Sequence, residues 1–154
     1  EGIAFVNTIY ANKSMDWPDI QFHMAPASIN SDGGVQVQKI LGLKPELYKE
    51  VYAPLHDVYT WTIMPLLLRP KSRGYVRLQS KNPFIPPIMN PNYYDEKIDL
   101  LTMIDGAKIA IRTANAKVFK QFGSRLYPKP LPNCKHFKFI SDEYLECAIR
   151  TISM

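Results

Sequence analysis

The sequence predicts an α+β fold in which an antiparallel or mixed β-sheet is packed on one face by helices. Three observations predict this class. In the first half, apolar and polar residues follow each other with a period of two, which is typical of strands. In the second half, apolar residues recur every three or four positions, which is typical of helices. Strand-like and helix-like segments are thus grouped in the two halves and do not follow one another in turn. With 46% hydrophobic and 21% charged residues, the 154 residues are typical of one globular domain with a core.

Strand patterns open the chain. Residues 2–6 are strand-like, and residues 20–24 alternate so that Phe22 shares one face with its apolar neighbours. His23 lies on the opposite face, next to Gln21. This period of two predicts a strand with one apolar and one polar face.

Two further strand patterns surround a turn. Residues 59–63 and 75–79 alternate, and Pro65 interrupts the first pattern, which indicates a sheet edge or a bulge. The turn residues of 69–74 separate the two patterns. We therefore expect a hairpin from Tyr59 to Ser80.

Two stretches are expected to lack regular structure. Residues 31–34 have the composition of a surface loop, and the residues that follow, up to about 54, show no clean period. The proline-rich stretch 82–91 cannot be helical, because each proline removes a backbone donor and favours extended geometry before it. We expect this stretch to cross the surface as a rigid connector.

A long helix is predicted to begin at Asp95, which is a good N-cap residue. A short turn or helix at 117–122 follows it and ends at Gly123, which is suited to a left-handed cap. The apolar stripe of the long helix consists of Leu100, Ile104, Ala107, Ile111 and Ala114.

The last helix is predicted to begin at Ser141, its N-cap. Asp142 and Glu143 lie at its positive end and Arg150 near its negative end. Charges of these signs stabilise the helix by interacting with its dipole. Its buried side is predicted to consist of Leu145, Ala148, Ile149 and Ile152.

The net charge of +5 does not indicate a nucleic-acid partner. The basic side chains are scattered and separated by acids, and no basic cluster is interleaved with aromatic residues. The composition therefore favours a mildly basic solvated surface.

The longest apolar run, residues 63–68, is far shorter than the ~20 residues that cross a membrane and contains a proline. Cys134 and Cys147 have the spacing of neither a zinc site nor a redox pair. They form either one disulfide or two buried thiols.

Several motifs together resemble those of glucose-methanol-choline (GMC) oxidoreductases. The central one is a Pro-x-Ser-Arg-Gly turn followed by an amphipathic strand and Asn-Pro, within residues 69–83. Residues 16–23 resemble the insect glucose dehydrogenase branch of this family. The resemblance continues through residues 87–94, the helix of 99–111 and the helix of 141–147.

The resemblance implies a flavoprotein that oxidises an alcohol or sugar by passing hydride to FAD. Its catalytic histidine would lie beyond Met154, and no Gly-x-Gly-x-x-Gly fingerprint for the dinucleotide occurs in the chain. We therefore expect residues 1–154 to form an incomplete substrate-binding domain that lacks the flavin-binding domain and the catalytic loop. The resemblance is compatible with an extracellular protein.

The same resemblance implies a pocket wall and a structural turn. The expected pocket residues are Phe22, His23, Trp61 and Met154, although a core position is the alternative for Phe22 and Trp61 and a structural role the alternative for His23. His56 and His136 are weaker candidates. Ser72, Arg73 and Gly74 are expected to form the turn: Ser72 bonds its own turn, Arg73 reaches a carboxylate or carbonyl, and Gly74 takes a positive φ.

Two functions from different classes fit these features. The first is the substrate-binding part of an FAD-dependent oxidoreductase, inactive by itself. The second is a non-catalytic binding or structural module derived from the same family. In the first case we expect an apolar face that a missing flavin domain would cover.

Overall fold

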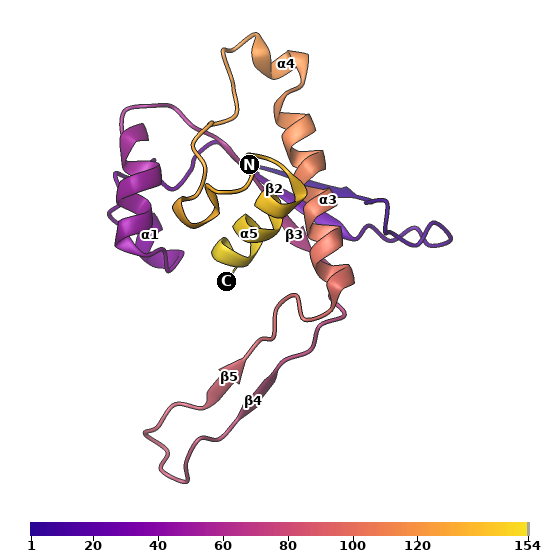
Figure 1. Ribbon diagram of the computed structural model, residues 1–154, viewed down its shortest axis with the longest axis vertical. Helices are drawn as coiled ribbons and strands as arrows, with labels where there is room; N and C mark the ends of the chain where they lie inside the picture. Colours follow the sequence, from indigo (N-terminus) through magenta and orange to yellow (C-terminus); the bar gives the residue numbers. More distant parts are fainter. Residues whose placement is uncertain (154) are drawn as a thin grey trace.

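The computed structural model describes residues 1–153, which form a body and a projecting arm (Figure 1). The body contains a three-stranded antiparallel sheet in the order β1-β2-β3. Pro65 lies in the edge strand β3, where a missing N–H is tolerated, as its position in the sequence indicated. The strands are β1 (Gly2–Val6), β2 (Ile20–Ala25) and β3 (Thr62–Leu67).

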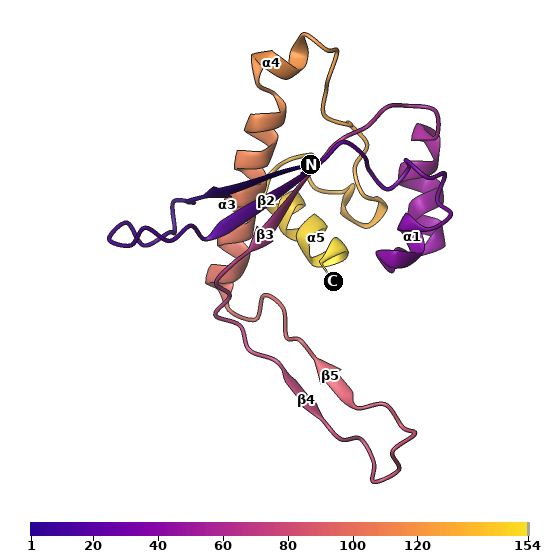
Figure 2. The same ribbon diagram turned by 180° about the vertical axis from the view of Figure 1, so that it is seen from behind.

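Helices α3 (Lys97–Ala114) and α5 (Asp142–Ile152) lie on the same face of this sheet (Figures 1 and 2). α3 approaches β2 so closely at Gly106 that an added Cβ would lie 3.0 Å from the side chain of Ile20. Helices on one face of an antiparallel sheet confirm the α+β class. The core between them consists largely of Ile20, Phe22, Leu100, Met103, Ile104, Tyr144, Leu145 and Ile149.

The remaining helical segments are short. They connect the strands and helices of the body and add little to the core, apart from Val51 and the disulfide residue Cys134. In chain order they are α1 (Val37–Ile40), α2 (Pro45–Leu47), the π-helix η1 (Tyr48–Tyr52), the 3₁₀ helix η2 (Ala53–Leu55), α4 (Lys117–Lys120) and the 3₁₀ helix η3 (Pro132–Cys134).

The arm consists of residues 71–91 and contains strands β4 (Tyr75–Arg77) and β5 (Ile88–Asn90), which pair with each other. The expected hairpin from Tyr59 to Ser80 is therefore wrong, because β3 pairs with β2 instead. Residues 82–91 are not helical, as expected, but they do not cross the surface of the body as a connector. These residues form the tip of the arm and its returning strand, and the strand begins only after the last proline of the tip.

The helix ends partly follow the predictions. The N-cap position of α3 is Glu96 rather than Asp95, and no side chain caps it. Gly123 has a φ of 72°, which confirms the left-handed cap after α4. Ser141 caps α5 through its Oγ, which accepts the N–H of Tyr144. Ile152, expected on the buried side of α5, is exposed near the end of that helix.

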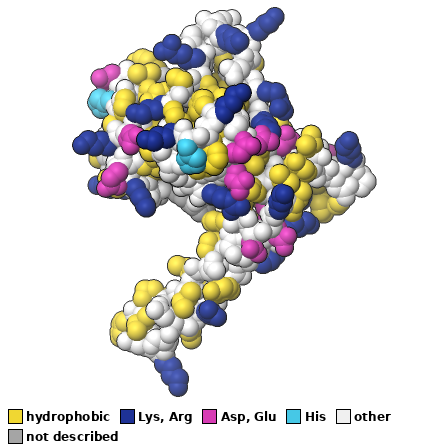
Figure 3. All heavy atoms as spheres, in the orientation of Figure 1, with side chains coloured by type: hydrophobic (Ala, Val, Ile, Leu, Met, Phe, Trp, Pro, Cys, Tyr) yellow, Lys and Arg dark blue, Asp and Glu magenta, His cyan; other side chains and the backbone are white. Residues whose placement is uncertain are grey.

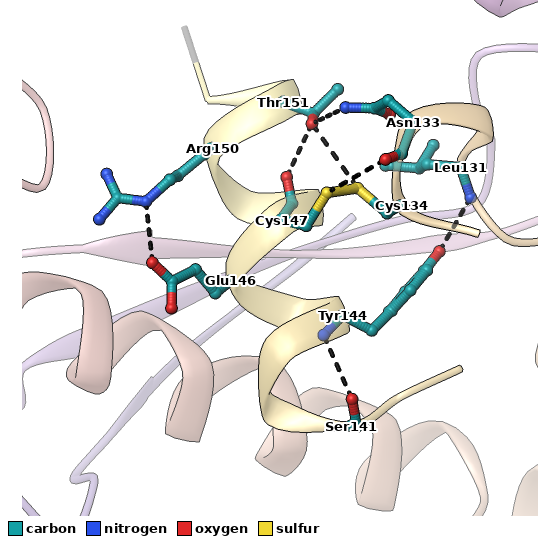
Figure 4. Close-up of a disulfide and its surroundings, with 9 residues drawn as sticks. All are labelled: Leu131, Asn133, Cys134, Ser141, Tyr144, Glu146, Cys147, Arg150 and Thr151. Carbon is teal, nitrogen blue, oxygen red and sulfur yellow. Dashed lines mark hydrogen bonds and ion pairs between the residues drawn. A yellow bond between two sulfur atoms is a disulfide. The ribbon is translucent and has the colours of Figure 1, made fainter. Parts of the chain in front are cut away.

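Cys134 and Cys147 form a disulfide, which resolves the two possibilities left by the sequence. The bond joins η3 to the middle of α5, as Figure 4 shows. On the same side, the hydroxyl of Tyr144 accepts the backbone N–H of Leu131 at 3.0 Å. The final helix is thus attached to the preceding loop by one covalent bond and by a buried hydrogen bond.

Candidate functional site

The two faces of the sheet differ in what covers them. The face that carries Ile20 and Phe22 packs against the helices, whereas the opposite face has no helix over it (Figure 2). We call this second surface the open face. The strand register places two complete rows of three side chains there, Ile3, His23 and Met64 in one and Phe5, Gln21 and Leu66 in the other. The pair Ala25 and Thr62 follows on the same face beyond the row of His23.

Four of the six side chains in these two rows are apolar and accessible. Ile3 and Phe5 are 62% and 59% exposed, and Met64 and Leu66 are about two-fifths exposed. Large apolar side chains gathered on one side of a sheet mark a binding surface more often than isolated ones do. The open face is therefore the candidate functional site.

The two polar side chains of these rows bond to each other in the centre of the open face. The amide nitrogen of Gln21 lies 2.6 Å from Nε2 of His23. Because an amide nitrogen can only donate, Nε2 accepts and the neutral imidazole carries its proton on Nδ1. The site thus offers one imidazole N–H donor and one amide oxygen to a ligand.

The structure separates the other predicted pocket residues from His23. Phe22 is 3% exposed and belongs to the core on the helical side of the sheet. Trp61 also lies towards the helices, where its ring stacks on Phe119 at 4.6 Å and its Nε1 donates to the Oγ of Ser124. Met154 lies outside the described residues.

Sequence reasoning did not identify the apolar members of the open face. The signal was present in the alternation of residues 2–6, which puts Ile3 and Phe5 opposite Ala4. Assigning them to the same surface as His23 required the pairing of β1 with β2, which is a long-range contact. Met64 and Leu66 were missed in the same way, because only the pairing of β3 with β2 places them beside His23 and Gln21.

The turn at 70–74 is held by Asp99, a residue of the first turn of α3 that is 3% exposed. Its Oδ1 accepts the backbone N–H of Lys71 at 2.7 Å, and its Oδ2 accepts the N–H of Ser72 at 2.7 Å. Burial raises the pKa of Asp99, but the hydrogen bonds from Ser72 and Lys71 together lower it below its ordinary value. The charged carboxylate therefore fixes the base of the arm.

Two of the three turn residues act differently from the expectation. The Oγ of Ser72 accepts the N–H of Glu96, so it bonds the start of α3 rather than its own turn. Arg73 donates to nearby carbonyl oxygens, the closest being that of Pro70 at 2.8 Å, as expected. Gly74 does not have a positive φ. It is needed because an added Cβ would lie 2.1 Å from the carbonyl oxygen of Asn90.

The described residues do not provide a phosphate cradle for a dinucleotide. The one glycine pair, Gly33 and Gly34, precedes a helix of four residues. The carboxylate of Asp32 already accepts the N–H groups of Gly34, Gln36 and Val37, which is where a phosphate would bind. Those bonds to Val37 and Gln36 lower the pKa of Asp32.

Residues 1–153 lack two other functional features. No group of three or more His, Cys, Asp or Glu side chains in this range could hold a metal ion. No helix within the same residues is long and apolar enough to cross a membrane.

Residues 70–154 match the family model for GMC oxidoreductases, which is more than half of the chain. The chain therefore belongs to the GMC oxidoreductase family. The matched region includes the arm, the Asp99 contact and both main helices.

Three relatives illustrate the breadth of the family. The chain is 42% identical over 88 residues to glucose dehydrogenase (FAD, quinone) of Drosophila pseudoobscura pseudoobscura, which covers 57% of this chain. It is 32% identical over 123 residues to alcohol dehydrogenase (acceptor) of Pseudomonas putida and 31% identical over 119 residues to the chloroplastic fatty acid photodecarboxylase of Chlamydomonas reinhardtii, which cover 79% and 77% of it. The matched parts span 14%, 19% and 18% of these relatives.

Proposed function

We propose that this chain is the substrate-binding part of an FAD-dependent oxidoreductase that acts on the CH–OH group of an alcohol or sugar. The observation that carries the proposal is the open face of the sheet, an accessible surface with one hydrogen-bonding pair in its centre. Two relatives whose names describe oxidation of glucose or an alcohol support it.

The longer protein would supply the flavin. The described residues have no cradle for it, and the matched relatives are more than five times longer than the regions they share with this chain. In the proposed reaction the alcohol carbon loses a hydride, for which the flavin is the acceptor, and the hydroxyl loses a proton to a base, so that the product is an aldehyde or ketone.

Within this chain, His23 would orient the substrate. Its Nδ1–H can donate to the substrate hydroxyl oxygen while Gln21 fixes the tautomer through Nε2. Phe22 and Trp61 would support the sheet without touching the substrate. Phe22 would fill the core beneath His23, and Trp61 would hold the start of β3. We assign Met154 to the pocket wall on the resemblance alone.

The partner of the open face would be the flavin-binding domain of the same protein. That domain would close over the face and exclude water from the substrate. The isolated chain is then expected to bind no flavin and to show no turnover.

The test uses the full-length flavoprotein and anaerobic reduction of its flavin by alcohols, followed by absorbance. A His23→Gln variant should raise KM by about fivefold, since one hydrogen bond to the substrate is lost. His136→Gln is the matched control, because His136 is exposed in the turn after η3 and is not part of the sheet. A flavin that no alcohol or sugar reduces would contradict the proposal and favour a non-catalytic module.

A further inference from the structure

The open face is chemically unsuited to a molecule with many hydroxyl groups. Four of the six side chains in its two complete rows have no hydrogen-bonding atoms, and the remaining two already bond to each other. The hydroxyl of Thr62, next on the same face, donates to the carbonyl oxygen of Ala27. None of the six is a carboxylate or a permanent cation. A bound sugar would therefore leave several hydroxyl groups against hydrocarbon, where each would lose its bonds to water.

From this composition we infer that the substrate is an apolar alcohol with one hydroxyl group rather than a sugar. The inference rests on the proposed function and narrows it. The central pair suits a single hydroxyl: the imidazole N–H at Nδ1 donates to its oxygen, whereas Nε2 is already occupied by the amide of Gln21. The hydrocarbon part would lie across Phe5, Leu66 and Met64.

The absence of a carboxylate among these six side chains also argues against a cationic alcohol. A quaternary ammonium group is bound by carboxylates or by several aromatic faces. Apart from the imidazole of His23, the two rows contain one aromatic ring, that of Phe5. A neutral, apolar substrate is the class that these residues match.

The experiment compares 1-hexanol with D-glucose, which both have six carbon atoms, on the full-length flavoprotein with the same artificial acceptor. The value of kcat/KM should be at least about a hundredfold higher for 1-hexanol, because a hydroxyl placed against an apolar wall costs about that factor. From 1-butanol to 1-hexanol it should rise about three- to fourfold for each added methylene.

A variant links this preference to the open face. Leu66→Gln should lower kcat/KM for 1-hexanol by about tenfold, mainly through KM, and should not lower the value for glucose, because the new amide can bond to a hydroxyl group. Ile40→Gln is the control, because Ile40 is 79% exposed in α1 and is not part of the face. Equal flavin content in both variants shows that they have folded.

A binding measurement does not depend on turnover. The tertiary alcohol 2-methyl-2-hexanol has no hydrogen on its carbinol carbon and cannot donate a hydride. It should inhibit oxidation of 1-hexanol competitively, and its Kd by calorimetry should increase about tenfold in Leu66→Gln.

The possible failures are distinguishable. Efficient oxidation of glucose with little oxidation of 1-hexanol would overturn the inference and leave the proposed function standing. Oxidation of neither compound, together with no binding of the tertiary alcohol, would overturn the inference, and the proposed function would fall as well if no other alcohol or sugar reduced the flavin. A Leu66→Gln variant that behaves like Ile40→Gln would also overturn the inference, because the hydrocarbon would then bind elsewhere.

Discussion

The body and the arm contrast in how their apolar side chains are used. In the body, Phe22 and Leu100 are almost inaccessible because a sheet and two helices enclose them. In the arm, Leu78 is 83% exposed and Phe84 91% exposed, although the hairpin is well formed. Figure 3 shows hydrophobic side chains spread along the arm.

The arm is therefore held by contacts at its base, in the turn at 70–74, and not by a core of its own. A two-stranded hairpin alone is marginally stable in water. Here the base is fixed by Asp99 and by Asn92, whose Nδ2 donates to the carbonyl oxygen of Arg73. The arm also carries four basic residues and no acidic residue.

The largest expected effect is in the body. Phe22→Ala should lower the free energy of unfolding by about 3–5 kcal/mol, because it removes a buried ring and leaves a cavity. Urea denaturation of the chain measures it. A loss below about 1 kcal/mol would mean that the core of the sheet is not closed as described.

The next effect concerns the junction of the two regions. Gly74→Ala should cost roughly 2–3 kcal/mol, since the new methyl group would overlap the carbonyl oxygen of Asn90 and force β4 and β5 apart. Gly2→Ala is the control, because its Cβ would meet Met24 at an ordinary 3.6 Å. Similar stabilities for the two variants would place the arm strands farther apart than described.

Asp99→Asn should cost about 1 kcal/mol, because an amide oxygen accepts the N–H groups of Lys71 and Ser72 more weakly than a carboxylate does. The pKa of Asp99 is lower in the folded chain than its ordinary 3.8, so its contribution is complete above that pH and is lost as the pH falls through the folded value. The difference between wild type and variant, followed by denaturation at several pH values, should therefore shrink below about pH 4. A difference that grows in acid would contradict the direction of the shift.

The smallest effect is expected in the arm. Leu78→Ser should change the stability of the chain by less than about 0.5 kcal/mol, because the side chain is already in water. The same substitution should lower binding of a hydrophobic dye to the chain. In the full-length protein a clearly larger loss of stability would show that the arm is covered there.

Local patterns predicted much of the body. The N-cap Ser141 and the left-handed Gly123 follow from residue types within one turn of the chain. The pairing of β3 with β2 did not, because it joins residues about 40 positions apart and the turn at 69–74 was equally compatible with a local hairpin. In the structure Asp99 accepts the backbone N–H of Lys71 in this turn, and no short-range pattern reveals that carboxylate as its partner.

The candidate site shows the same division. The period of two around His23 predicted correctly that it lies opposite Phe22. Trp61 was assigned by the same period, but β3 begins one residue later and the ring packs against Phe119. The neighbours of a side chain on other strands and helices depend on tertiary packing. A short stretch of one sequence does not reveal them.

The disulfide between Cys134 and Cys147 has a practical consequence for producing this protein. In a reducing bacterial cytoplasm the bond would not persist. The C-terminal helix would then be attached to its loop by hydrogen bonds such as that between Tyr144 and Leu131. Expression in a host with an oxidising folding compartment, or refolding with a glutathione buffer, is therefore the preparation that preserves this end of the molecule.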